Sequence, residues 1–275
     1  MNALPTLFVS HGAPTFALEP GSTGAALAAL ARRLPRPRAI LAVSAHWETA
    51  TPVVSAATAP ETIHDFYGFP APLYRLRYPA SGAPWLAERV AALLGDASLR
   101  ATIDPGHGLD HGAWVPLMHM WPDADIPVAQ LSIQTHLGPA HHYGLGKALA
   151  PLAHEGVLML ASGGVTHNLR EFRMSRENES VEPYVVEFRN WLAERLAAGD
   201  VDAVLDYRAR APHAARAHPS EDHFLPLFVA FGAATGGRRN ERAHEAVTYG
   251  VIGMDAYVFA AERLDATLPA AASTT

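Results

Sequence analysis

The sequence predicts a single α/β domain in which helices flank a mostly parallel β-sheet. Short apolar runs alternate along the chain with segments that have helical periodicity, as they do in α/β proteins. The runs are continuous instead of alternating apolar with polar residues, which is typical of strands covered on both faces. The chain has 275 residues, of which 49% are hydrophobic and 17% charged, so it can bury a large core.

Four apolar runs are predicted to be buried strands, at residues 7–10, 39–44, 126–132 and 157–162. Helices are expected at about residues 22–34, 82–95, 139–153 and 182–197. Ser22 or Thr23 is a candidate cap for the first helix, and Gly138 followed by a proline marks the start of the third. Residues 51–80 lack periodicity and are expected to form a long ordered loop, of the kind that often carries function.

The domain organisation is expected to be simple, because no repeat or linker interrupts the pattern. One catalytic domain is predicted over residues 1–265, followed by an Ala-rich tail over residues 266–275. The formal net charge of −6 argues against nucleic acid as a partner, since phosphate binding needs clustered Lys and Arg. No apolar run approaches the roughly 20 residues of a membrane span, and the first residues do not resemble a signal peptide. A cytoplasmic protein is expected, with its oligomeric state undecided.

Histidine is the most informative residue type, with 15 copies and no cysteine in the chain. Without cysteine, a metal must be held by imidazole, carboxylate or water. Three histidines follow predicted strands: His11 comes after the first, His46 after the second and His167 shortly after the fourth. Ligands bind outside the carboxyl ends of strands in open α/β sheets, so these three side chains are expected to converge. One such histidine alone is usually only a turn residue, but the repeated placement favours a functional site.

Two further histidines belong to this set. His111 precedes a predicted helix at residues 115–120, in a loop or at the helix start. His223 is expected in the first turn of a helix that Ser220 could cap and that continues through Phe231. Neutral imidazoles suit Zn and Fe(II), and a three-histidine set leaves positions open for substrate or oxygen. Histidines that do not bind the metal would be available as general acid or base.

The remaining polar candidates have weaker signals. Asp65, Asp110 and Asp222 could orient imidazoles, although local capping roles explain them equally well. His64 and His107 are held as pocket candidates, and the other eight histidines are assigned to surface or helix packing. From these residues alone, a zinc hydrolase that uses metal-activated water fits as well as a redox enzyme, and a non-catalytic metal-binding relative is a third alternative.

Eight stretches, spread over nearly the whole chain, give the sequence a family resemblance. They include Ser10–Pro14, Ser44–Trp47, Leu109–Trp114, Ser162–Leu169 and His223–Leu227; the others are Pro35–Ile40, Thr62–Phe66 with Gly68–Pro70, and Trp121–Pro127. In this order they resemble the DODA-type extradiol ring-opening dioxygenases, which are related to the LigB, or class III, enzymes. The resemblance implies the LigB-like α/β fold, which is similar to phosphorylase/hydrolase-like folds.

The resemblance also implies an activity and a set of site residues. His11, His46 and His223 would hold one divalent metal, with Fe(II) expected for catalysis and Zn(II) as an alternative bound ion. His167 matches the catalytic base, close enough to the metal to be mistaken for a ligand, and His111 matches a histidine that guides substrate or protons. The substrates would be O2 and a catechol, possibly 3,4-dihydroxyphenylalanine, whose ring takes up both oxygen atoms. The residues expected to bind the catechol are His64, Trp47, Phe66 and Trp114.

Overall fold

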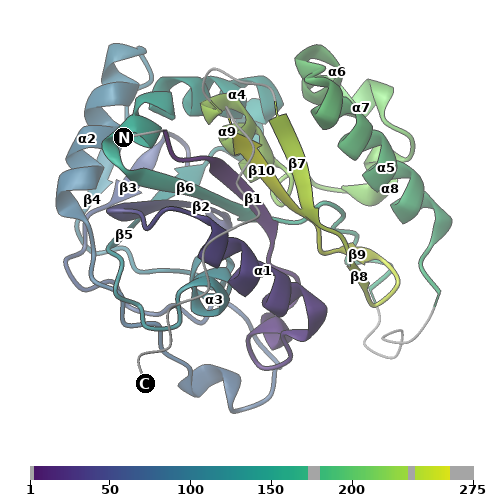
Figure 1. Cartoon of the computed structure of the whole chain (residues 1–275), viewed down its shortest axis with the longest axis horizontal. Coiled ribbons are helices and arrows are strands. Elements are labelled where there is room, and N and C mark those ends of the chain that lie inside the picture. The colour runs from purple at the N-terminus through teal and green to yellow at the C-terminus, as the bar shows by residue number, and fades with distance from the viewer. Residues whose placement is uncertain (1–2, 173–179, 235–238, 261–275) are drawn as a thin grey trace, which may run out of the picture.

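The computed structural model describes residues 3–172, 180–234 and 239–260. Its centre is an eight-stranded mixed sheet with the strand order β4-β3-β5-β2-β6-β1-β10-β7 (Figure 1). The four inner strands β5, β2, β6 and β1 run parallel, β10 pairs antiparallel with β1, and β7 pairs antiparallel with β10. At the other edge, β3 pairs antiparallel with β5 and parallel with β4. The predicted α/β class with a mostly parallel sheet is confirmed.

The strands are Thr6–Ser10 (β1), Ala39–Glu48 (β2), Val53–Ser55 (β3), Thr102–Asp104 (β4), Val128–Ile133 (β5), Val157–Gly163 (β6), Arg239–His244 (β7), Val247–Thr248 (β8), Ile252–Gly253 (β9) and Ala256–Ala260 (β10). The α-helices are Gly21–Arg33 (α1), Pro84–Asp96 (α2), His111–Met120 (α3), Gly138–Leu149 (α4), Pro183–Ala198 (α5), Val201–Leu205 (α6), Tyr207–Arg210 (α7), Ala214–Ala217 (α8) and Leu225–Ala233 (α9). Short 3-10 helices cover Pro14–Ala17 (η1), Leu73–Arg75 (η2), Thr135–Leu137 (η3) and Ala150–Glu155 (η4).

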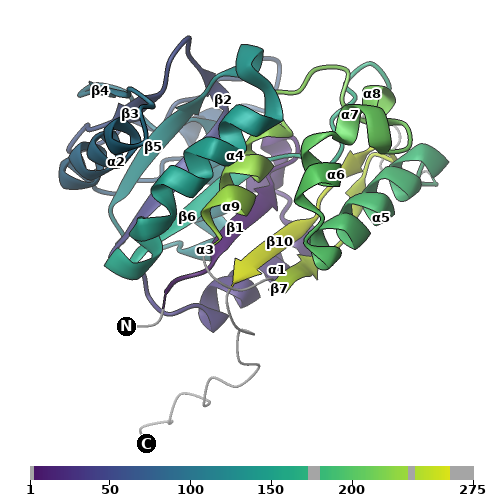
Figure 2. The ribbon, with the colours of Figure 1, turned by 90° about the horizontal axis from the view of Figure 1, so that it is seen from above.

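Helices cover both faces of the sheet (Figure 2). Helices α4 and α9 pack together on one face, with α2 beside them, while α1 and α3 lie on the other. Every residue of β1, β5, β6 and α9 is buried, which explains why their sequences are apolar without alternation. The buried hydrophobic side chains form one cluster across both layers.

Several sequence-based boundaries need correction. The segment 51–80 is not one loop, because it contains β3 and η2; a strand of three residues is too short to show a period. Strands β4, β7 and β10 were not predicted either. Helix α1 follows Pro20 without a side-chain cap, so neither Ser22 nor Thr23 caps it. The predicted domain end at residue 265 and the tail 266–275 lie outside the described residues.

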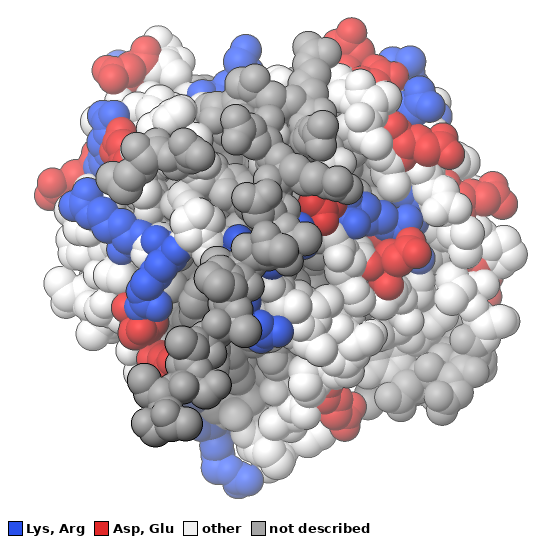
Figure 3. Space-filling model, in the orientation of Figure 1, with Lys and Arg blue, Asp and Glu red and all other residues white. Residues whose placement is uncertain are grey.

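Two surface findings bear on partners. Among the described residues, every helix is too short or too polar to cross a membrane. On the face drawn in Figure 3, positive and negative side chains are interspersed over the described surface.

Candidate metal centre

His11 and His46 come from the two strands that flank β6 at the centre of the sheet. His11 directly follows β1, as predicted, and is buried. His46 lies inside β2 and not after it, because the strand continues to Glu48, which pairs with Ile133 of β5. The His11 N–H donates to the Gly163 carbonyl oxygen of β6 at 3.1 Å, whereas His46 lies in the register shift of β2 between Val43 and Glu48.

His223 reaches the same point from the turn before α9. The expected position in the first helical turn is wrong, because α9 begins at Leu225 and Ser220 is not its cap. Pro226 explains the boundary: proline lacks an N–H and is tolerated only in the first turn of a helix. Gly163, the last residue of β6, permits the close approach of this turn, since a Cβ there would lie 2.1 Å from the His223 carbonyl oxygen.

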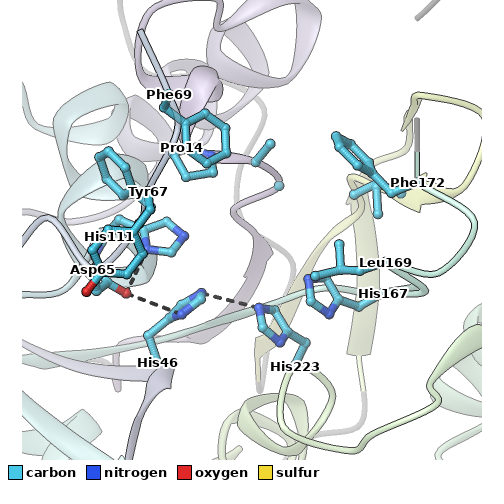
Figure 4. Close-up of a pocket in the computed structure, with 14 residues that line it drawn as sticks. Pro14, His46, Asp65, Tyr67, Phe69, His111, His167, Leu169, Phe172 and His223 are labelled. Carbon is cyan, nitrogen blue, oxygen red and sulfur yellow. Dashed lines mark hydrogen bonds and ion pairs between the residues drawn. The ribbon is translucent and has the colours of Figure 1, made fainter. Parts of the chain in front are cut away.

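The three imidazoles point their Nε2 atoms at one another (Figure 4, which labels His46 and His223). His46 Nε2 lies 3.0 Å from His11 Nε2 and 3.2 Å from His223 Nε2. Each Nδ1 faces an oxygen instead. His11 Nδ1 lies 2.9 Å from Ser162 Oγ, His46 Nδ1 lies 3.3 Å from a carboxylate oxygen of Asp65, and His223 Nδ1 donates to the Asp222 carboxylate.

This arrangement fits a divalent metal ion. Burial, reinforced by the neighbouring histidines, lowers the pKa of all three imidazoles well below the usual 6.5, so the rings are neutral at pH 7. With their Nδ1 protons directed outward, the rings present Nε2 lone pairs to one another, which is unfavourable without a shared cation. Two nitrogens that bind one ion at about 2.1 Å lie roughly 3.0–3.4 Å apart, as found here. His11, His46 and His223 are thus the residues that could hold the metal.

Asp65 connects this centre to His111. His111 is the first residue of helix α3, and the backbone N–H and the Nδ1 of His111 each donate to the Asp65 carboxylate at 2.9 Å. Burial alone would raise the pKa of Asp65, but the hydrogen bonds and charge interaction with His111 lower it to about 2. The ionised carboxylate therefore orients His111 and faces His46 Nδ1 at the same time.

Asp110 holds the N-terminus of α3 in place. Its carboxylate accepts from Ala113 N as the helix cap, from Ser44 Oγ at 2.6 Å and from the Gln130 side-chain amide. Ser44 Oγ in turn accepts from the backbone N–H of His46 at 3.2 Å. Asp110 is fully buried, and its burial raises the pKa of the carboxyl. Of the two roles left open by the sequence, the structure shows the capping role for Asp110, whose carboxylate reaches His46 only through Ser44.

His167 stacks on His223, with ring centroids 3.4 Å apart and an interplanar angle of 11°. Burial lowers the pKa of His167 to about 4, although Asp222 opposes the shift, so the ring is neutral at pH 7. Its ligand atoms lie within 4.8 Å of those of Asp222 and His223, in a group separate from that of His11 and His46. The expected convergence of the strand-end histidines is confirmed.

These residues surround a cavity of about 330 Å³. Figure 4 shows Asp65, Tyr67 and His111 on one side and His167, Leu169 and Phe172 on the other. Most of the wall is apolar, which suits an aromatic ligand. The described residues that line the cavity are Gly12, Ala13, Pro14, His46, Asp65, Phe66, Tyr67, Phe69, His111, His167, Leu169, Phe172, His223 and Ile252.

Of the four residues expected to bind substrate, Phe66 lines the cavity. The other three lie elsewhere. Trp47 is buried and stacks on His107 with ring centroids 3.6 Å apart. His64 Nε2 donates to the Leu76 carbonyl oxygen, 3.1 Å away.

The third, Trp114, is fully buried, and its indole N–H donates to the Ile63 carbonyl oxygen. This bond supports the segment that carries Asp65 and Phe66. Pro14, Phe69 and Leu169 were missed as lining residues, although each lies within a stretch that carries the family resemblance. Phe172 had no comparable signal in the sequence.

Comparison with known proteins agrees with this geometry. A family model described as the catalytic LigB subunit of aromatic ring-opening dioxygenase matches residues 6–260. The chain belongs to the LigB family. A Beta vulgaris protein named 4,5-DOPA dioxygenase extradiol is 42% identical over 262 residues, which cover 94% of this chain and 97% of that one.

An Escherichia coli (strain K12) protein of the same name is 40% identical over 240 residues, covering 85% of this chain and 86% of that protein. The crystal structure of an uncharacterized protein from Escherichia coli K12 matches with a TM-score of 0.76 and 32% sequence identity, covering 93% of this chain and 99% of that one. The predicted family and the predicted ring-cleaving dioxygenase are confirmed. Family membership and the names of these relatives favour the dioxygenase over the zinc hydrolase and the non-catalytic relative.

Proposed function

We propose that this LigB-family enzyme cleaves a catechol that carries a charged side chain, with 3,4-dihydroxyphenylalanine as the representative substrate and Fe(II) as the working metal. The observation that carries the proposal is the convergence of three neutral imidazole Nε2 atoms beside an apolar cavity. The names of the Beta vulgaris and Escherichia coli relatives support the substrate class.

In this proposal His11, His46 and His223 hold the metal. When bound, the ion would act as a template and Lewis acid for the two adjacent hydroxyls and would supply the redox chemistry that Zn(II) lacks. Asp65 and Asp222 accept from Nδ1 of two of the ligands, and such outer partners fix ring orientation and raise ligand basicity.

His167 is proposed as the general base. Its ring is neutral, lines the cavity and stacks on the ligand His223, so it is placed to accept a proton from a hydroxyl at the metal centre. His111 is proposed to handle the second proton. Because its Nδ1–H is bound to Asp65, Nε2 is the nitrogen that remains for substrate in the cavity.

The apolar walls are proposed to hold the substrate ring. Phe66 contacts the His111 ring edge-on, with centroids 5.6 Å apart, and packs against Phe69. Phe172, which Figure 4 shows on the opposite side, and Ile252 also line the cavity. A ring enclosed in this way is shielded from water while its diol faces the histidines. We propose no direct substrate contact for Trp47, His64 or Trp114.

The test is oxygen uptake by the full chain after anaerobic reconstitution with Fe(II). A panel of 3,4-dihydroxyphenylalanine, dopamine and 4-methylcatechol is compared with tyrosine, which lacks the second hydroxyl. We expect about one O2 consumed per catechol cleaved, none with tyrosine and none with Zn(II)-loaded protein. Absence of uptake with every catechol would overturn the proposed function, and equal rates with Zn(II) would overturn the assignment of Fe(II).

The cytoplasmic location expected from the sequence is also part of this proposal. Fractionation of cells that express the chain would test it, with activity expected in the cytoplasmic fraction.

A further inference from the structure

His218 is a fully buried histidine that the proposed chemistry does not use. Its ring stacks on Phe224 with centroids 4.5 Å apart, and the rings of Phe188 and Tyr207 surround it edge-on at 5.5 and 6.3 Å. From the sequence, His218 was expected to serve only in surface or helix packing. Its polar atoms indicate a second role.

The His218 ring makes one specific hydrogen bond. Nε2 lies 2.7 Å from the Val165 carbonyl oxygen, which can only accept, so the ring carries a proton on Nε2. Nδ1 is buried without a partner among the described residues, which agrees with this tautomer of a neutral ring. Burial lowers the pKa of His218 to about 3, so the ring stays neutral at pH 7.

Among the described residues, this bond is one of three that join residues 164–167 to residues 217–223, and the exposed Arg216–Glu171 ion pair joins the same two segments farther from the site. The backbone N–H of His167 donates to the Ala217 carbonyl oxygen at 2.9 Å, and that of Gly164 donates to the His223 carbonyl oxygen at 2.8 Å. Of the three bonds, only the one from His218 is made by a side chain. It is therefore the one that a substitution can remove.

The segment around His218 is itself held firmly. Arg208 Nη1 donates to the His218 carbonyl oxygen at 2.6 Å, and its Nε donates to Glu221 at 3.3 Å. The Tyr207 hydroxyl donates to the same carboxylate at 2.8 Å. His218 can thus transmit a fixed position to Val165, two residues before His167.

We propose that His218 is a positioning residue, which holds the base His167 against the metal ligand His223 through its hydrogen bond to Val165. The inference rests on the proposed roles of His167 and His223. Removal of the donor would leave a buried carbonyl oxygen unsatisfied and release the segment that carries the base. A displacement of about 1 Å in a catalytic group can lower the rate by about 100-fold.

The test compares two variants. His218→Leu has a side chain of similar size but no hydrogen-bond donor, whereas His218→Gln has an amide nitrogen that can replace Nε2 as the donor to Val165. Full-length protein is loaded with Fe(II), and kcat per bound metal, KM for the best catechol of the panel, and metal content are measured. We expect His218→Leu to lower kcat by about 10- to 100-fold with little change in KM. His218→Gln should retain most of the wild-type kcat.

His142→Leu is the matched control. His142 is equally buried and donates from Nδ1 to the Gly138 carbonyl oxygen at 2.7 Å, but it lies on α4, away from the cavity. Its loss should lower the thermal midpoint and leave kcat per metal unchanged. An unchanged kcat in folded His218→Leu would show that His218 only packs in the core. A folded His218→Gln with a kcat as low as that of His218→Leu would show the same.

A second measurement needs neither variant nor activity. Nitrogen-15 NMR of the metal-free protein should show His218 as the Nε2–H tautomer, with a proton that exchanges slowly with water. The Nδ1–H tautomer or rapid exchange would overturn the proposal even if both variants failed to fold. If the NMR result holds but no catechol is cleaved, the proposed function fails and the hydrogen bond stands.

Discussion

The metal centre has two halves that are built differently. His11 directly follows β1 and His46 lies near the end of β2, and both of these central strands pair with neighbours on both sides. His167 and His223 come from irregular segments that follow β6 and precede α9, and hydrogen bonds between those segments hold them together. The sheet half therefore takes its geometry from the fold, whereas the segment half depends on a few individual contacts.

This difference indicates which half of the site a substitution displaces more easily. Displacing a residue of a central strand requires breaking several ladder hydrogen bonds at once. Displacing His167 relative to His223 requires only the loss of contacts such as those of Gly163, Gly164 and His218. We expect substitutions around the segment half to change rate strongly while the sheet stays folded.

Among substitutions that leave the metal ligands and the base in place, the largest effect is expected for Gly163→Ala. The new Cβ would lie 2.1 Å from the His223 carbonyl oxygen, so the turn that carries His223 must move away from β6. A displacement near 1 Å corresponds to a loss of kcat of about 100-fold. Steady-state oxygen uptake and metal content, measured beside a circular dichroism spectrum, check this result.

Gly144→Ala is its control, because nothing lies within 4 Å of the added Cβ in the middle of α4. It should keep full activity and gain about 0.5–1 kcal/mol of stability, since alanine is the better helix former. Equal activity in both alanine variants would show that the segment half tolerates displacement.

An intermediate effect is expected for Asp65→Asn, because Asp65 contacts both His46 of the sheet half and His111, which lines the cavity. The amide keeps the size of the side chain but removes the negative charge that faces His46 and His111. Loss of such an outer partner typically costs 10- to 100-fold in metal affinity or activity. Calorimetric titration of the metal-free protein with Zn(II) measures the affinity, and a change below about twofold would refute the orienting role.

The smallest effect is a change in stability that originates outside both halves. Burial lowers the pKa of His142 to about 4 in the folded protein, from the usual 6.5. The unfolded chain therefore binds more protons between these values, and stability is lost as the pH falls from about 6.5 towards 4. Between pH 7 and pH 5 His142 should account for about 2 kcal/mol.

Urea unfolding of metal-free wild-type protein and His142→Gln at the two pH values tests this expectation. The variant should lose about 2 kcal/mol less than the wild type over that interval. Equal losses would mean that His142 is not buried as a neutral ring.

The sheet half was largely predictable from sequence, and the segment half was not. Continuous apolar runs locate β1, β2 and β6, and the topology of parallel sheets then brings His11 and His46 together. For His223 the pattern predicted a helical position, because Ser220 resembles a cap and the boundary depends on Pro226. Hydrogen bonds such as that between His218 and Val165 join residues distant in sequence, and no local pattern records them.

The substrate side shows the same limit. Trp47 and Trp114 have the chemistry of ring-packing residues, but both are buried outside the cavity, where they contact His107 and Ile63, 60 and 51 positions away in the chain. Phe66 lines the cavity from a segment without periodicity, where only the resemblance gave a signal.

The most direct test of the whole account is the metal content of His167→Ala and His223→Ala, each reconstituted with Fe(II) and assayed for catechol cleavage. We predict that His167→Ala retains about one metal per chain but loses activity by 10²- to 10⁴-fold, as expected for a general base. His223→Ala should lose both the metal and the activity. A metal-free His167→Ala beside a metal-loaded His223→Ala would contradict the assignment of ligand and base.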